Sequence, residues 1–339
     1  MKILVTGGAG FIGSNFINYW LENNQGDEII NLDAMTYAAN PLTVEYHKKK
    51  WGVRYSFVQG DICDENLVRE VVGKIDAVVH FAAESHVDRS VTDPGNFVRT
   101  NVVGTLTLLD AVRKSGKSIR FHHVSTDEVF GTLEFNTKDK FSENTPYSPR
   151  SPYSASKAGS DHLVRAYYET YHLPVTITNC SNNFGPFHFP EKVIPLYVTR
   201  ALKDKLIPIY GEGKAIRDYL YVEDHCRAIE AVLKKGILGE TYCVGGDSER
   251  NTNQVAENIL GLLKKPETLI RHTSDRPGHD PRYAIDHNKI TKELGWKPMN
   301  TFEQGIEKTI NWYKENEAWW MPISHKAEEV AERYLVNQN

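Results

Sequence analysis

The sequence predicts an α/β protein, with a doubly wound parallel sheet followed by a smaller mixed α/β lobe toward the C-terminus. Strand-like and helix-like runs alternate through the first half of the 339 residues, which is typical of a parallel sheet covered by helices on both faces. Past residue 185 the runs become shorter, and Pro, Gly and charged residues interrupt them. We therefore expect two partly interleaved domains, residues 1–185 and 186–339, with a strand and a helix returning from the second to the first.

The first-half elements follow one another in a regular order. Runs with strand character are KILVTG (2–7), DEIINLD (27–33), VRYSFVQGD (53–61), DAVVHFAA (76–83), SIRFHHVSTD (118–127) and PVTITNCSNN (174–183). Helices are expected at 11–24, from about Pro94 to Arg113, and from Pro152, where Ser151 can cap the first turn. Near the C-terminus, Thr301 and Gln304 suit a capping box before an amphipathic helix.

Composition excludes several functional classes. The net charge of −4 provides no broad positive field for nucleic acid. His122 and His123 lie within a strand run and are expected in the core, and we expect no metal. The four cysteines are too widely spaced for a zinc site or a disulfide framework: Cys63, Cys180, Cys226 and Cys243. The chain opens on a strand pattern and contains no membrane-length apolar run, so we expect a cytoplasmic protein.

The glycine-rich segment TGGAGFIG (6–13) carries the strongest binding signal. It follows the first strand and opens the first helix, and its glycines permit a tight turn and close backbone approach to a pyrophosphate. Asp33 follows about 20 residues beyond Gly13, at the end of the second strand, where it can accept from both adenosine ribose hydroxyls. A glycine turn without a ligand is the alternative, which this context disfavours. Because Ala34 rather than an arginine follows Asp33, a Rossmann domain that binds NAD rather than NADP is predicted.

The later strand ends point to the same crevice, since ligands bind beyond the carboxyl ends of parallel strands. Asp61 could accept from the adenine amine while Ile62 packs on the ring. Small Ala82 and Ala83 let the backbone approach the cofactor, and Thr100 is expected nearby.

The segment YSASK places Tyr153 and Lys157 at i and i+4, on one face of the expected helix. Such a pair is often surface decoration, but here it follows a dinucleotide-binding pattern. An adjacent ammonium and a positive nicotinamide would stabilise the Tyr153 phenolate, which could then remove a proton from a substrate hydroxyl. Thr126 could hydrogen-bond the same oxygen.

These features resemble the extended short-chain dehydrogenase/reductases, and within them the dTDP-glucose 4,6-dehydratases. The resemblance covers most of the chain, through TGGAGFIG, DAMTYAAN, FAAESHVDRS, STDEVFG, SPYSASKAGSD, NCSNNFGPFHFPEKVIP, RDYLYVEDH and DRPGHDPRY. Epimerases of this group lack the acidic pair of STDEVFG. GDP-mannose dehydratases and UDP-glucuronate decarboxylases tend to have Thr-Ser-Glu at this position. Asp127 is therefore the residue that distinguishes the dTDP-glucose 4,6-dehydratases from these relatives. Ala34 departs from the family, whose members often carry lysine there.

The resemblance implies dehydration of dTDP-glucose, and the chemistry needs two carboxyl groups in different protonation states. After oxidation at C4, a base must remove the C5 proton while an acid protonates the leaving C6 hydroxyl. Glu128 would be the base, and Asp127 the acid, its pKa raised by neighbouring negative charge and partial burial. An exposed acidic turn is the alternative interpretation of the pair.

The resemblance also implies the remaining contacts. Residues at the cofactor would be Gly7, Gly10, Phe11, Ile12, Gly13, Asp33, Ala34, Met35, Thr36, Asp61, Ile62, Phe81, Ala82, Ala83, Ser85, Thr100, Tyr153, Lys157 and Asn183. Residues at the nucleotide sugar would be Ser85, His86, Thr126, Asn182, Glu191, Lys192, Val193, Pro208, Tyr210, Arg217, Asn251, Arg276 and His279. Of these, the cations Lys192, Arg217 and Arg276 suit the two phosphate groups.

Three further expectations concern assembly, pathway and rival functions. The helices from Pro94 and Pro152 would pair with their copies in a four-helix bundle, giving a homodimer. The product would serve dTDP-rhamnose biosynthesis. Rival functions are an NAD-dependent nucleotide-sugar epimerase or decarboxylase, and a non-catalytic NAD-sensing protein, although a sensor has no need of Tyr153, Lys157, Asp127 and Glu128.

Overall fold

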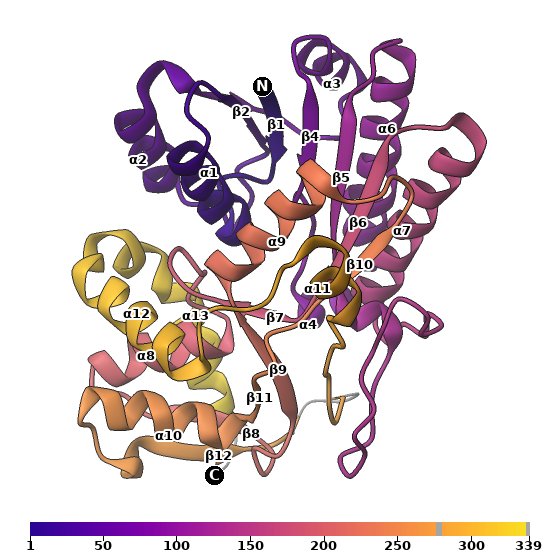
Figure 1. Cartoon of the computed structure of the whole chain (residues 1–339). Coiled ribbons are helices and arrows are strands. Elements are labelled where there is room, and N and C mark those ends of the chain that lie inside the picture. The colour runs from indigo at the N-terminus through magenta and orange to yellow at the C-terminus, as the bar shows by residue number, and fades with distance from the viewer. Residues whose placement is uncertain (276–279, 337–339) are drawn as a thin grey trace.

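A seven-stranded parallel sheet forms the centre of the computed structural model, which describes residues 1–275 and 280–336 (Figure 1). The strand order is β10-β6-β5-β4-β1-β2-β3. Its strands are β1 (Lys2–Thr6), β2 (Glu28–Asp33), β3 (Tyr55–Gln59), β4 (Ala77–His80), β5 (Arg120–Thr126), β6 (Val175–Cys180) and β10 (Thr241–Val244). The α/β doubly wound fold predicted from the alternation is confirmed.

Helices pack on both faces of this sheet. Apolar residues of one group of helices share a core with one face: α3 (Glu65–Val72), α6 (Gly104–Lys114) and α7 (Pro152–Tyr171). The other face is covered mainly by α1 (Phe11–Asn23) and α9 (Val222–Lys235). Shorter or peripheral elements are α2 (Pro41–Trp51), η1 (Gly52–Arg54), α4 (Val87–Thr92), α5 (Pro94–Phe97), η2 (Val98–Val103), η3 (Asp127–Phe130) and α11 (Asn288–Leu294). No helix in the described part of the chain is both long and apolar enough to cross a membrane.

A smaller lobe lies beside the carboxyl ends of the strands (Figure 1). Two small sheets, ordered β11-β9-β7 and β12-β8, pack with helices around a second core. The strands are β7 (Asn182–Phe184), β8 (Ile207–Tyr210), β9 (Ile216–Tyr221), β11 (Glu249–Asn251) and β12 (Ile270–Thr273). The helices are α8 (Val193–Leu202), α10 (Thr252–Leu263), η4 (Glu267–Leu269), α12 (Phe302–Glu315) and α13 (Glu317–Val336).

The expected helix caps are confirmed. Ser151 caps α7, and its hydroxyl accepts from the Ser154 N–H, with Pro152 as the first helical residue. Thr301 and Gln304 form the capping box of α12. The first cap matters for the site because it fixes where α7, the helix that carries Tyr153 and Lys157, begins.

The segment 174–183 differs from its prediction as one strand, because it forms two strands in different sheets. At Ser181 the N–H donates to the Val244 carbonyl, which ends the ladder with β10. The chain then leaves the central sheet, and β7 pairs in parallel with β9 of the smaller lobe. Asn182 and Asn183 therefore lie at the junction of the sheet and the lobe.

The expected helix from Pro94 to Arg113 is continuous in space but changes its geometry in the middle. Between α5 and α6 it forms a π-helical segment, η2. Within η2, Asn101 is buried, and its side-chain amide donates to the Glu84 carbonyl at 3.0 Å and to the Ser156 hydroxyl at 2.8 Å. Segments of this kind often occur at functional sites. Here η2 ties the loop after β4 to α7.

Candidate active site

The turn between β1 and α1 has the close packing that a dinucleotide cradle needs. Gly7 has φ +72°, and a Cβ added there would lie 2.7 Å from the Ala82 backbone nitrogen. A Cβ at Gly13 would lie 2.5 Å from the Gly7 carbonyl oxygen. Only glycine fits at these two positions, and the helix that follows presents its N-terminus to the turn. The residues present therefore fit the predicted dinucleotide.

Asp33 ends β2 and joins the two sides of this cradle. One carboxylate oxygen accepts from the Ala9 N–H at 2.9 Å, and the other accepts from the Met35 N–H at 2.8 Å. Burial raises the pKa of Asp33, although these two hydrogen bonds oppose the shift. Each oxygen can accept a second hydrogen bond, as contact with ribose hydroxyls would require.

Asp61 and Ile62 have neighbours that the sequence did not indicate. The Asp61 carboxylate pairs with the Arg99 guanidinium at 2.7 Å and accepts from the Cys63 N–H at 2.8 Å. Ile62 is only 4% exposed, because its side chain packs against Gly104 at the start of α6. Little of the Ile62 surface is left for the adenine ring on which it was expected to pack.

The loop after β4 lies directly beside the glycine turn. Its Ala82 N–H donates to the Thr6 hydroxyl at 3.2 Å, and that hydroxyl also contacts His80 Nδ1 at 2.7 Å. In this loop Phe81, Ala82 and Ala83 are partly accessible and Ser85 is exposed, and Thr100 of the neighbouring η2 is also partly accessible. The structure thus brings the first and fourth strand ends together.

The acidic pair occupies the first turn of η3, directly after β5. Thr126 caps this turn, and its hydroxyl accepts from the Glu128 N–H at 3.2 Å. This geometry points the two carboxyl groups into different surroundings, because Asp127 is 1% exposed whereas Glu128 is half-buried. An exposed acidic turn, the alternative interpretation, is therefore excluded for Asp127.

The surroundings of Asp127 favour its protonated form. Burial, the Glu128 charge and the Asp218 charge raise the pKa of Asp127 well above its usual range, while Arg217 and the Thr126 hydroxyl oppose them. One of its carboxyl oxygens has no hydrogen-bond partner among the described residues. A buried, protonated carboxylic acid with an unused oxygen is suited to donate a proton.

Tyr153 lies in the first turn of α7 and is buried near the same groups. Burial and the Glu128 charge raise its pKa, while a hydrogen bond with Thr126 lowers it. The sequence analysis predicted that the Tyr153 phenolate is stabilised. The protein groups around Tyr153 instead raise its pKa, which favours the neutral phenol. A phenolate at Tyr153 would therefore need a positive charge close to its hydroxyl.

Lys157 is also buried, one turn further along α7. Its ammonium donates to the Val124 carbonyl at 2.9 Å and lies 3.4 Å from His123 Nε2. Burial lowers the pKa of Lys157, and the Asp161 charge opposes this effect. The prediction that His122 and His123 belong to the core is confirmed, since both are completely buried.

The loop after β4 and the segment before α8 bring four predicted substrate residues together. The Lys192 ammonium donates to the Ser85 carbonyl at 3.3 Å, and His86 Nε2 lies 3.9 Å from a Glu191 carboxylate oxygen. Tyr37, which the sequence analysis missed, donates to Glu191 at 3.0 Å. Val193 follows as the first residue of α8.

Asn182 and Asn183 differ in how their amides are used. The Asn182 side-chain carbonyl is buried and has no partner within the described chain. The Asn183 amide donates to the Ser181 carbonyl at 2.9 Å, and its oxygen contacts His225 Nδ1 at 3.0 Å. His225 thus holds Asn183, a role with no local sequence signal.

The predicted residues further along the chain are distributed over three strands. Arg217 and Asn251 belong to the paired strands β9 and β11, and the Asn251 side chain caps α10 by accepting from the Gln254 N–H at 2.9 Å. Pro208 and Tyr210 belong to the separate β8–β12 sheet. Two predicted residues, Arg276 and His279, lie outside the described residues.

One neighbour of the acidic pair was missed. Tyr283 packs under the Arg217 guanidinium, 4.2 Å from ring centroid to carbon, and burial and then the Glu128 charge raise its pKa. Its hydroxyl donates to Asp280. The segment DPRY that contains it was recognised only as part of the family pattern, and its fold places it against a strand far away in sequence.

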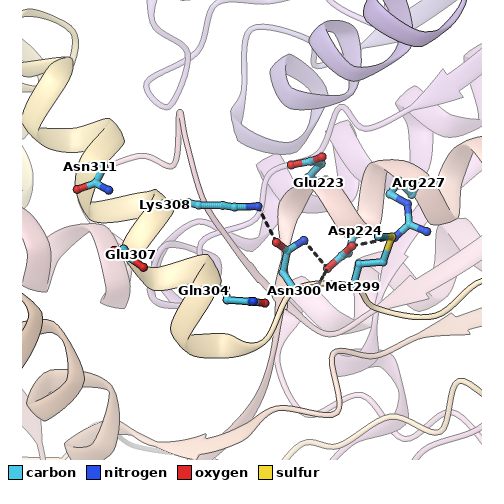
Figure 2. Close-up of a pocket in the computed structure, with 9 residues that line it drawn as sticks. All are labelled: Glu223, Asp224, Arg227, Met299, Asn300, Gln304, Glu307, Lys308 and Asn311. Atoms are coloured by element: carbon cyan, nitrogen blue, oxygen red, sulfur yellow. Dashed lines mark hydrogen bonds and ion pairs between the residues drawn. The ribbon is translucent and has the colours of Figure 1, made fainter.

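A separate pocket of about 370 Å³ lies between α9 and α12 (Figure 2). Its lining residues are polar or charged apart from Met299, and none of them is a predicted site residue. In this pocket Asp224 is already paired with Arg227 at 3.0 Å and with the Asn300 amide at 3.0 Å. Across the described residues, no group of three or more His, Cys, Asp or Glu gathers as a metal site would require.

Comparison with known proteins decides the family. The model of the GDP-mannose 4,6 dehydratase family matches residues 4–309. The dTDP-glucose 4,6-dehydratase of Xanthomonas campestris pv. campestris strain B100 is 54% identical, and the match covers 93% of this chain and 94% of the relative. The chain belongs to the dTDP-glucose 4,6-dehydratase family.

Solved structures of dTDP-glucose 4,6-dehydratases share its fold. The enzyme of Bacillus anthracis strain Ames, in complex with NAD, is 47% identical and has a TM-score of 0.88, with 95% of this chain and 99% of that one covered. A double mutant of the Streptomyces venezuelae enzyme, also with NAD bound, is 44% identical and has a TM-score of 0.91, with 95% and 100% covered. The family resemblance drawn from the motifs is confirmed over nearly the whole chain.

Proposed function

We propose that this protein converts dTDP-glucose to dTDP-4-keto-6-deoxy-glucose and water, with NAD as its cofactor. One observation carries the proposal. A buried carboxyl group, Asp127, and a half-buried one, Glu128, stand beside the Thr126–Tyr153 hydrogen bond at the end of β5. This arrangement offers a base for the C4 hydroxyl together with a separate acid and base for elimination, a set that an epimerase does not need.

The dinucleotide would be held by the glycine turn, by Asp33 and by the loop after β4. When bound, NAD supplies the acceptor for the C4 hydride and the donor that later reduces C6. The preference for NAD is supported by Ala34, which brings no positive charge for a ribose phosphate.

Tyr153 is the proposed base for the C4 hydroxyl, and the Thr126 hydroxyl orients the same oxygen. Because burial opposes ionisation of Tyr153, the positive charge of Lys157 is needed to make its phenolate accessible near neutral pH. Oxidation at C4 then produces a ketone, which acidifies the C5 hydrogen.

Glu128 removes the C5 proton, and Asp127 donates its proton to the departing C6 hydroxyl, which leaves as water. Asp127 is assigned as the acid because burial and the neighbouring charges raise its pKa. Protonated Glu128 can return its proton to C5 as C6 is reduced. At the end Tyr153 has gained one proton and Asp127 has lost one, so turnover requires one further proton transfer between them, through solvent or product.

The substrate side of the site is assigned to the smaller lobe. Lys192 and Arg217 are the proposed diphosphate ligands, together with Arg276, and the cluster of Ser85, His86 and Glu191 is assigned to the sugar side. We assign residues 1–185 to NAD binding and residues 186–339 to the nucleotide sugar, partly interleaved. The position of β10 and α9 against the first sheet supports the interleaving.

The proposal extends to assembly, location and pathway. A homodimer formed by a four-helix bundle is supported by apolar side chains exposed on the outer face of η2 and α6: Val98, Val103 and Leu106. A cytoplasmic location is supported by four cysteines that are all thiols. The product is a precursor of the kind that dTDP-rhamnose biosynthesis requires.

Following one hydrogen tests the reaction. With deuterium at C4 of dTDP-glucose, the label should appear at C6 of a keto sugar, as measured by NMR and mass spectrometry of the product. Return of the label to C4 would indicate an epimerase, and absence of any ketone from a panel of nucleotide sugars would indicate a binding protein.

A further inference from the structure

Lys157, His123 and Asp161 form a buried cluster, and the proposed reaction steps use neither His123 nor Asp161. His123 Nε2 is 3.4 Å from the Lys157 ammonium and 3.1 Å from a carboxylate oxygen of Asp161. Side chains of all three are buried. Asp161 follows Lys157 by one turn of α7, and His123 comes from β5, so the cluster joins the catalytic helix to the strand that leads to Thr126.

The Asp161 carboxylate is held in its charged form. Its second oxygen accepts from the Ser125 hydroxyl at 2.8 Å, the Tyr147 hydroxyl at 2.8 Å and the Asn179 amide at 3.3 Å. Burial alone would raise the pKa of Asp161, but its contacts with His123, Lys157 and Tyr147 lower it below the usual range. A buried carboxylate with this many donors is a fixed negative charge.

His123 does not supply a positive charge. Burial and the Lys157 charge lower the pKa of His123 to about 4, so it is neutral near pH 7. Its Nε2 faces both the Lys157 donor and the Asp161 acceptor, while Nδ1 has no partner within the described chain. The ring therefore separates a cation from an anion and contributes no charge of its own.

We propose that Asp161 is a positioning residue that, together with His123, keeps the Lys157 ammonium charged and aimed toward Tyr153. The argument is electrostatic. An ammonium removed from water loses its proton unless an opposite charge lies close by, and Asp161 is the carboxylate that supports the charge on Lys157. The titratable groups that interact with Lys157 from the packed elements are His80 of β4, His123 of β5, Cys180 of β6 and Asp161 of α7.

Substitution of Asp161 by Asn keeps the size and the hydrogen bonds of the side chain but removes its charge. The titration of Lys157 can be followed directly in the full-length protein labelled with ¹³C at the lysine ε-carbon, with the signal assigned by its loss in Lys157→Met. In Asp161→Asn this titration should move to lower pH by about one unit or more. This readout does not depend on the proposed reaction, so it still tests the inference if dTDP-glucose is not the substrate.

The kinetic consequence rests on the proposed function and has a defined sign. Loss of the Lys157 charge raises the pKa of Tyr153, so the acid limb of the pH profile for C4 oxidation should move to higher pH. At neutral pH the rate constant of C4 oxidation should fall about tenfold for each pH unit by which the acid limb moves, with little change in KM. A stopped-flow measurement of the reduced nicotinamide formed in the first turnover isolates the step.

Asp224→Asn is the matched control. Asp224 is as completely buried as Asp161 and pairs with Arg227 and Asn300 around the separate pocket (Figure 2). This substitution should lower Tm but leave the Lys157 titration and the acid limb unchanged. If Asp161→Asn does not fold, Asp161→Ser also removes the charge, keeps a hydrogen-bonding group and should shift the Lys157 titration in the same direction.

Two results would overturn the proposal. One is an Asp161→Asn protein that folds and retains the wild-type Lys157 titration. The other is an Asp161→Asn protein that loses rate but keeps the wild-type acid limb, with no greater loss than Asp224→Asn shows. That result would mean that Asp161 has only a structural role.

Discussion

At the scale of single residues, the proposed roles of the adjacent carboxyl groups of Asp127 and Glu128 rest on what surrounds each of them. Asp127 is buried and its pKa is raised first by burial, then by the charges of Glu128 and Asp218. Glu128, one position later in η3, remains half-buried. The short helical turn that begins at Thr126 therefore gives the two adjacent carboxyl groups different surroundings, as the proposed acid and base require.

Removing the acid and the base should stop the reaction after its first step. In the double variant Asp127→Asn, Glu128→Gln, C4 oxidation should persist while elimination is blocked, since shape and hydrogen bonding are kept but proton transfer is lost. Reduced nicotinamide should accumulate on the enzyme, as measured by absorbance. Glu134→Gln, the same chemical change at an exposed position nearby, should behave as wild type, and Tyr153→Phe should form no reduced cofactor. Native-rate product from the double variant would contradict these roles.

Asp218 should control the pH at which Asp127 loses its proton. Burial raises the pKa of Asp218 to about 6, so it is largely ionised at neutral pH and its charge helps to keep Asp127 protonated. Asp218→Asn removes that charge, so the pKa of Asp127 should fall and the basic limb of the kcat profile should move to lower pH. A basic limb at the wild-type position would show that burial and Glu128 alone set the Asp127 pKa.

Local sequence was sufficient for some of these residues and not for others. Thr126, Asp127, Glu128, Tyr153 and Lys157 sit in short motifs whose spacing follows from strand-to-helix geometry. Asp218, Asn101, Tyr283 and His225 act across long sequence separations, through β9, the π-helical turn η2 and the segment before α11. No periodicity predicts such pairings, because they depend on which strands of the two sheets lie side by side.

At the scale of elements, the β1–α1 turn combines a positive φ with close packing of the backbone. Two glycine substitutions can measure these two effects separately. Gly7 and Gly26 both have positive φ, at +72° and +87°, but only at Gly7 would a Cβ meet neighbouring backbone. Each substitution by Ala should cost about 1–2 kcal/mol of stability from strain. Gly7→Ala should in addition weaken NAD binding by more than about tenfold, or 1.4 kcal/mol, because the Ala82 loop must move.

Calorimetric titration of cofactor-depleted protein measures both effects against wild type. Gly26→Ala should bind NAD normally despite its lower Tm, since nothing lies within 4 Å of its added Cβ. Equal NAD affinity in the two variants would argue against the turn as the dinucleotide cradle.

The element boundaries that were missed have specific physical causes. The run 174–183 was predicted as one strand because no Gly or Pro interrupts it, and the break at Ser181 arises from the pairing of that residue with β10. The π-helical segment η2 lies within an ordinary helical pattern, and it is stabilised by Asn101, whose partners Glu84 and Ser156 belong to other elements. Tertiary hydrogen bonds override local pattern in both cases.

At the scale of the whole molecule, the parallel sheet and the smaller lobe were predictable because alternation of elements is a property of the entire chain. The placement of β10 beside β6, after about sixty residues of lobe, is not contained in local pattern. The second half of the chain is thereby tied to the central sheet. The Arg217 charge of β9 lies close enough to Asp127 to oppose the rise of its pKa.

The outer surface of α7 is the basis of the last prediction, that the chain forms a homodimer. Helix α7 turns Tyr153 and Lys157 inward, while small residues such as Ala155 and Ala166 are exposed on its other side, next to the apolar face of η2 and α6. A second copy related by a two-fold axis would cover this surface, as expected for a four-helix bundle. Light scattering of the wild-type chain at micromolar concentration should therefore give about twice 38.5 kDa.

Leu106 and Leu262 provide a matched pair of substitutions for this interface. Leu106 on α6 is 39% exposed, and Leu262 on α10, in the smaller lobe, is 44% exposed. Because a two-fold interface presents every residue twice, Leu106→Glu buries two new charges and should shift the mass toward the monomer. Leu262→Glu adds the same charge outside the proposed interface and should remain dimeric. A monomeric wild type, or two variants that both stay dimeric, would rule out this face as the contact.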